Sequence, residues 1–94
     1  MIFNNRAEKM IRQQIEELTI DRIAPKKNDI ENSIKWMYWS GTFTKRKQLK
    51  MLELLENKYT RVLEEFYRKQ DEIAEQNYQR LLRSVDMSQP KFNE

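Results

Sequence analysis

Residues 45–86 read KRKQLKMLELLENKYTRVLEEFYRKQDEIAEQNYQRLLRSVD, and this stretch decides the fold. It contains no glycine and no proline, and it is rich in Leu, Glu, Lys, Arg and Gln, which are good helix formers. The sequence therefore predicts one uninterrupted helix from Lys45 to about Asp86, about 60 Å long at the rise of an α-helix. Pro90 lies in the polar end of the chain, so the helix is expected to stop before it.

Two apolar rows follow the predicted long helix. The first row holds spacings of three and four residues, as in the seam of a coiled coil. It consists of Leu52, Leu55, Tyr59, Val62 and Phe66. The second row continues the apolar surface toward the C-terminus, with Ile73 between the two rows. It consists of Leu63, Tyr67, Ala74, Tyr78, Leu81 and Val85. Because an amphipathic helix gains most of its stability from packing, both rows are expected to be covered.

A turn and a shorter helix are predicted before the long one. Gly41 is the only glycine of the chain, and glycine adopts left-handed dihedral angles at the least cost. The helix before it is expected to run from Asn28 to near Ser40, where Glu31 completes the spacing of a capping pair with Asn28. Thr42 or Thr44 is placed to cap the long helix. The apolar stripe of the shorter helix is predicted to be Ile30, Ile34, Met37 and Tyr38.

The first helix is predicted from about Arg6 to Leu18 or slightly beyond. Asn5 and Glu8 repeat the capping spacing at its start. Pro25 is expected to end this segment, because the residue before a proline is disfavoured in the helical region, and residues 25–27 then form a connector. The apolar stripe of this helix is predicted to be Ala7, Met10, Ile11, Ile15 and Leu18.

Together these elements predict an all-α fold with two short helices and one long C-terminal helix. We expect a helical hairpin or small bundle that extends into a coiled coil. Residues 1–44 form the short-helix region, residues 45–88 the long helix and residues 89–94 a polar tail, all within one structural unit. If the two short helices fold back as a pair near residues 45–66, the rest of the long helix is left uncovered, so we expect a homo-oligomer, most simply a dimer, or a larger protein partner. A closed, monomeric three-helix bundle is the alternative.

Composition excludes most catalytic chemistry. The chain has no cysteine and no histidine, which removes thiolate nucleophiles, histidine general bases and the usual zinc ligands. One glycine cannot build a phosphate-binding glycine loop. The adjacent pairs Glu64–Glu65 and Asp71–Glu72 point about 100° apart on a helix and are expected to be solvated. We therefore predict a non-enzyme without metal or cofactor, and a carboxylate metalloenzyme is the weakest alternative.

No run of residues approaches the roughly 20 apolar residues of a membrane span. The first residues, MIFNNRAEK, have no apolar core of a signal peptide. These features predict a soluble, intracellular protein of the cytoplasm that does not contact a membrane.

Positive charge is concentrated in the middle of the chain. Residues 26–50 contain seven basic and two acidic side chains, a net charge of +5, whereas the whole chain carries +3. The basic residues Lys45, Arg46 and Lys47 lie in the predicted first turn of the long helix, where cations oppose the helix dipole. With Lys50 one turn later, they form a candidate site for phosphates or for carboxylates of a protein.

Aromatic residues precede the basic segment. Trp36 and Trp39 are three residues apart and share a helix face, and Phe43 follows the glycine turn. Burying both tryptophans together with the apolar stripe would make the short helix apolar nearly all round, so we expect them on the surface. Trp36, Trp39 and Phe43 are therefore predicted to contact a protein partner, beside the basic residues. Packing into the core is the alternative role for such residues.

These patterns favour a small helical interaction protein that acts as an assembly, adaptor or regulatory subunit. On this prediction Tyr78, Leu81 and Val85 of the long helix meet a second copy or a larger protein. The alternative is a nucleic-acid-associated accessory protein whose segment 44–50 contacts phosphates. Sequence reading of DNA is not predicted, because the basic segment lacks the Asn and Ala residues with which basic-region zippers contact bases.

Overall fold

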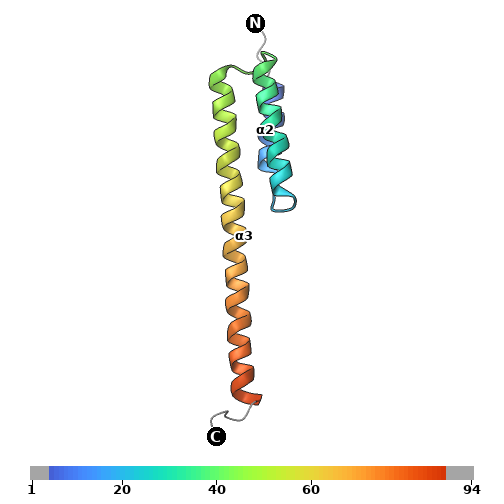
Figure 1. Ribbon diagram of the computed structural model, residues 1–94. Coiled ribbons are helices and arrows are strands. Elements are labelled where there is room, and N and C mark those ends of the chain that lie inside the picture. Colours follow the sequence, from blue (N-terminus) through green and yellow to red (C-terminus); the bar gives the residue numbers. More distant parts are fainter. Residues whose placement is uncertain (1–4, 89–94) are drawn as a thin grey trace. The chain divides into compact units, whose positions relative to one another are not determined.

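The computed structural model describes residues 5–88, and the side chains of residues 5–84. These residues form three helices and no strand: α1 (Asn5–Glu16), α2 (Ile23–Trp39) and α3 (Lys45–Ser88) (Figure 1). The predicted all-α fold with two short helices and one long C-terminal helix is confirmed. The described part of the chain separates into two compact units that divide after Glu64, and α3 contributes residues 45–64 to the first.

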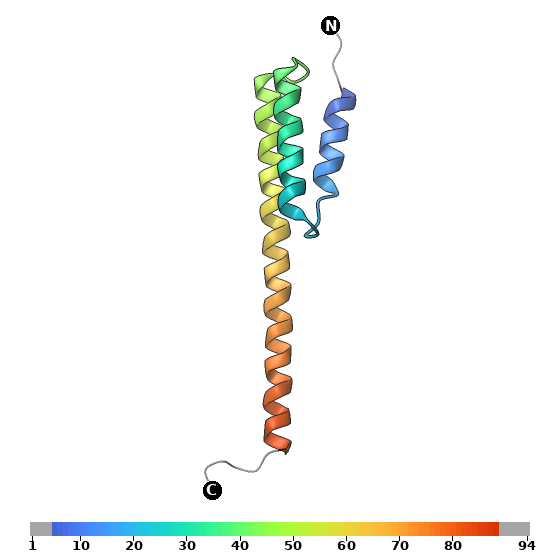
Figure 2. The ribbon, with the colours of Figure 1, turned by 45° about the vertical axis from the view of Figure 1, so that its right-hand side comes forward.

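The first unit is a three-helix bundle in which α2 runs opposite to its two neighbours. Lys47, near the start of α3, contacts Glu8 near the start of α1, and Lys58 contacts the last residue of α1, Glu16. Lys27, near the start of α2, meets Glu56 of α3. Figure 2 shows the α1–α2 connection at one end of this bundle and the turn before α3 at the other.

The core of the bundle takes an apolar stripe from each helix. Four large side chains have less than 2% of their surface exposed. They come from all three helices and are Ile11, Ile34, Met51 and Leu55. Around them lie six further buried residues, namely Ala7, Ile15, Leu18, Ile23, Ile30 and Phe43. Met37, Leu52, Leu54, Tyr59, Val62 and Leu63 pack against this core with part of their surface exposed.

The predicted stripes need one correction in each short helix. In α2, Ile30 and Ile34 are buried and Met37 packs on the core, but Tyr38, which was predicted to belong to this stripe, is exposed, with 37% of its surface accessible. Met10 was predicted to be part of the stripe of α1 and is 46% exposed. It lies one residue before the fully buried Ile11 and so points about 100° away from the centre of the stripe.

Helix boundaries around Pro25 also differ from the prediction. The first helix ends at Glu16, and Leu18 is buried outside it, where its amide donates to the Ile15 carbonyl at 3.1 Å. The second helix begins at Ile23 instead of Asn28, so Pro25 lies in its first turn and does not separate two helices. Proline is tolerated there because the amides of a first turn have no partner within the helix. The chain reverses at Arg22, which adopts left-handed dihedral angles with φ 52°.

The predicted turn at Gly41 is confirmed. Gly41 has φ +85°, and its amide donates to the Tyr38 carbonyl at 3.1 Å. The amide of Thr42 donates to the Met37 carbonyl at 2.8 Å, so the last carbonyls of α2 are satisfied by a Schellman motif. Thr44 then caps α3, since its hydroxyl oxygen accepts the Lys47 amide at 3.1 Å.

We predict that Leu55→Ala lowers the free energy of unfolding of the first unit by about 2–5 kcal/mol, because it opens a cavity where the side chain is fully buried. Leu49→Ala is the matched control on the same helix, since Leu49 is 55% exposed, and we expect a change within about 0.5 kcal/mol. Urea unfolding followed by circular dichroism measures both. Equal losses in the two variants would show that Leu55 is not in the core.

Candidate interaction surfaces

The two tryptophans lie on the surface of α2 that faces away from the core. Trp36 is 63% exposed and Trp39 is 81% exposed. They point about 200° and 140° round the helix from Ile34, which is completely buried. The prediction that they are not buried with the apolar stripe is thus confirmed, whereas their role in binding stays a prediction.

Phe43 does not belong to this surface. Its side chain is 5% exposed and is part of the core of the first unit. The Schellman turn causes this, because the Phe43 amide also donates to the Met37 carbonyl, at 2.9 Å, and thereby brings the residue back over the end of α2. The expectation that Phe43 contacts a partner together with the tryptophans is therefore wrong for the folded unit.

The basic residues at the start of α3 turn toward α1. Arg46, Lys47 and Lys50 line a small hollow of about 220 Å³ together with Arg12 and Thr44. Lys45 is exposed and does not line this hollow. Within residues 5–84, no hydrogen bond, ion pair or ring contact joins either tryptophan to the basic residues. The single aromatic and basic corner expected from the sequence is thus two surfaces.

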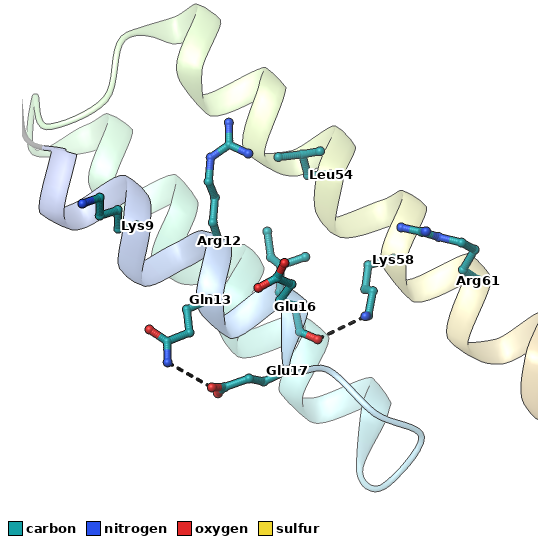
Figure 3. Close-up of a pocket in the computed structure, with 9 residues that line it drawn as sticks. Lys9, Arg12, Gln13, Glu16, Glu17, Leu54, Lys58 and Arg61 are labelled. Atoms are coloured by element: carbon teal, nitrogen blue, oxygen red, sulfur yellow. Dashed lines mark hydrogen bonds between the residues drawn. The ribbon is translucent and has the colours of Figure 1, made fainter.

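A second, larger open groove lies farther along α1 and α3 (Figure 3). Its volume is about 850 Å³, and Arg12 lines both features. We call the two together the basic groove. Its basic side chains are Lys9 and Arg12 from α1, and Arg46, Lys47, Lys50, Lys58 and Arg61 from α3. Its other lining residues are Gln13, Ile15, Glu16, Glu17, Thr44 and Leu54.

Glu8 links the two helices beside the basic groove. Its carboxylate accepts a hydrogen bond from the Lys47 ammonium at 2.9 Å and another from the Arg12 guanidinium at 2.9 Å. These two bonds, the one from Lys47 first, hold the pKa of Glu8 below its ordinary value of 4.5. Farther along, the Lys58 ammonium donates to the backbone carbonyl of Glu16 at 3.1 Å, as Figure 3 shows. Lys58 thereby satisfies one of the free carbonyls at the end of α1.

A second group of charges joins α2 to α3. The Lys27 ammonium lies 2.6 Å from the Glu56 carboxylate, 3.5 Å from that of Glu31 and 5.1 Å from the centre of the Tyr59 ring. The bond to Glu56 raises the pKa of Lys27. The pKa of Glu31 is lowered, first by its bond to Lys35. Each of these ions has an opposite charge within reach, so this group stabilises the bundle and offers no free site.

The lowered pKa values of Glu8 and Glu31 make the stability of the fold depend on pH. Since the pKa of Glu8 is lowered in the folded state, its ion pairs stabilise the fold above the unfolded-state pKa of about 4.5. This contribution is lost as the pH falls through the lower, folded-state pKa. The pKa of Glu31 is also lowered, so its ion pairs stabilise the fold in the same direction of pH.

We predict that Glu8→Gln reduces the loss of stability between pH 7 and pH 3, measured by urea unfolding. Glu53→Gln, on an exposed face of α3, is the control and should keep the wild-type loss. An unchanged pH dependence in Glu8→Gln would contradict the assignment.

The second unit exposes its apolar residues. Tyr78 is 56% exposed and Leu81 is 60% exposed. Val85, the third residue predicted to meet a partner here, lies outside the residues whose side chains are described. Tyr67, Ile73 and Leu82 are 61%, 50% and 41% exposed. Within the unit, the Phe66 and Tyr67 rings meet edge to face at 5.5 Å, and Arg68 and Lys69 both approach Glu65.

Among the described residues, no group of three or more Asp or Glu side chains is placed to hold a metal ion. The paired residues Glu64–Glu65 and Asp71–Glu72 are all exposed. Within residues 5–88, no helix combines the length and the apolar character needed to cross a bilayer. Comparisons of the chain with protein-family models, curated proteins and solved structures gave no match.

Sequence reasoning missed four of the seven basic residues of the basic groove, namely Lys9, Arg12, Lys58 and Arg61. Lys47 and Lys50 were predicted as an anion site, but Lys58 and Arg61 continue the same stripe of α3, with Leu54 between the pairs. These five positions are spaced by three or four residues, so the pattern was present in the sequence. What the sequence could not supply was the neighbour, because nothing in it says that this stripe of α3 lies beside Arg12 of α1.

Proposed function

We propose that this chain is a non-enzymatic interaction protein that docks on a larger protein and acts as an assembly, adaptor or regulatory subunit. The observation that carries the proposal is the joint exposure of Trp36 and Trp39 on the outer face of α2. Tryptophan is among the residues most enriched where binding energy is concentrated at protein interfaces. An aromatic side chain buries roughly 150–250 Å² when covered, so two neighbours offer a large apolar contact.

The surroundings of the tryptophans support a protein partner. Lys35, next to Trp36, is 55% exposed and pairs with Glu31, and Ser40, next to Trp39, is exposed. Aromatic residues with polar and charged neighbours are the usual composition of a protein interface, which has an apolar centre and a polar rim. The backbone below them is held by the Schellman motif, so the two indoles are presented on a fixed helix end.

We predict that Trp36→Ala combined with Trp39→Ala abolishes recovery of a partner from native lysate while the free energy of unfolding changes by less than about 0.5 kcal/mol. Each tryptophan at the centre of an interface contributes about 2 kcal/mol or more, so the affinity should fall about 30-fold for one tryptophan and up to about 1,000-fold for both. Met10→Ala is the control, since Met10 is exposed on α1. If the double variant unfolds, or if it recovers the same proteins as Met10→Ala, the proposal is wrong.

The second part of the proposal is self-association through the second unit. Its described residues leave a row of large apolar side chains exposed, including Tyr78 and Leu81. The intrinsic helix propensity of its residues contributes little to the stability of an amphipathic helix, which comes chiefly from the packing of its apolar face. A second copy of the same segment offers a matching apolar face, which makes a dimer the simplest way to cover it.

We predict that the wild-type chain is a dimer in sedimentation equilibrium and that Tyr78→Ser combined with Leu81→Ser shifts it to the monomer. Leu49→Ser, which alters an exposed leucine of the first unit, should remain dimeric. The helicity of residues 5–64 should not change in either variant, because their core contains none of these side chains. A wild-type chain that is monomeric at every concentration would rule out self-association.

A further inference from the structure

The excess positive charge of the chain lies entirely in the basic groove. Seven basic side chains line it, and three acids, Glu8, Glu16 and Glu17, lie in or beside it, which leaves a net charge of +4. The whole chain has 18 basic and 15 acidic residues. The remainder therefore has 11 basic and 12 acidic residues, a net charge of −1. The fold has gathered on one face a charge that the sequence distributes over residues 9–61.

Five of the seven cations have no ion pair within residues 5–84. Arg12 and Lys47 are both bonded to Glu8. Lys58 donates only to a backbone carbonyl, which leaves its positive charge without a counter-charge and holds the side chain at the wall of the groove. The five cations available to a ligand are thus Lys9, Arg46, Lys50, Lys58 and Arg61.

The spacing of these cations fits a repeating anion. Along α3, Arg46 and Arg61 are 15 residues apart, which is about 22 Å at the rise of an α-helix. One strand of a nucleic-acid duplex carries a phosphate about every 3.4 Å along its axis and winds round that axis, so a straight row of this length contacts several phosphates of the backbone and not a single one. A single phosphate or a small acid would engage only one end of such a site.

The remaining lining residues favour phosphate contacts over other kinds of recognition. Among the residues that the structure describes, no aromatic side chain lines the basic groove, so these residues offer no platform on which bases of a single strand could stack. Its apolar residues are Ile15, which is buried, and Leu54, which is half-buried. A helix of an acidic protein would need a row of apolar anchor sites, and two such residues do not supply one.

We infer that the basic groove binds the phosphate backbone of double-stranded nucleic acid without selecting the base sequence. Long, flexible lysine and arginine side chains with no base-reading partners are typical of contacts that position a protein on a duplex. This inference is independent of the protein-docking function, because the groove lies between α1 and α3 whereas the tryptophans lie on the outer face of α2.

The test is the salt dependence of binding to a fluorescently labelled DNA duplex of mixed sequence, followed by anisotropy. If five cations each neutralise a phosphate, log K falls with log[salt] at a slope of about −4.5, and the affinity falls about 500-fold between 50 and 200 mM salt. In Lys58→Gln combined with Arg61→Gln, three contacts remain, the slope becomes about −2.7, and the same salt change costs about 40-fold.

The matched control is Lys26→Gln combined with Lys35→Gln. It removes the same two charges from α2, outside the basic groove, and it should keep the wild-type slope. Absence of binding at 50 mM salt, or equal slopes for both double variants, overturns the inference. Polyglutamate that displaces the duplex at equal concentration of charge also overturns it, because the groove would then be a site for acidic protein. Circular dichroism of both variants confirms that the fold is retained.

Discussion

Everything else in the first unit depends on the shared burial of Ile11, Ile34, Met51 and Leu55. These side chains bring one stripe of each helix to a common centre, and complete burial of each contributes about 1.5–3 kcal/mol. When one stripe of a helix packs into the core, the residues on its opposite side face the solvent. This packing therefore also determines which side chains lie on the surface. The burial of Ile34 puts the tryptophans of α2 on the surface, and that of Ile11 and Met51 sets the facing sides of α1 and α3.

Charged contacts then select the register in which the stripes meet. Lys27 stands in the inner stripe of α2 between Ile23 and Ile30, and its ammonium group reaches Glu56 and the Tyr59 ring. Glu8 joins α1 to Lys47 at the other end of the bundle. Such partly exposed pairs contribute about 1 kcal/mol or less. Their larger effect is to match α1 and α2 with particular turns of α3, and the match to α1 creates the basic groove.

How far the sequence predicted the structure depended on whether the deciding interaction was local. The turn at Gly41, a threonine cap on α3 and the stripe of α2 except Tyr38 followed from local rules, and they are present as predicted. Pro25 was misjudged because a proline that ends one helix and a proline in the first turn of the next give the same local pattern. Phe43 and the partners of Lys47 were out of reach, since each depends on a neighbour far away in the sequence.

Hydrogen exchange of the full chain at several protein concentrations shows whether residues 5–64 pack by themselves while residues 65–84 do not. Packing of this kind gives slow exchange at the amides of Ile11, Ile34, Met51 and Leu55 that is independent of concentration. Protection within residues 65–84 should rise with concentration, as a second copy covers them. Strong protection of residues 65–84 in the most dilute sample, or loss of protection at the four core residues on dilution, would contradict this packing.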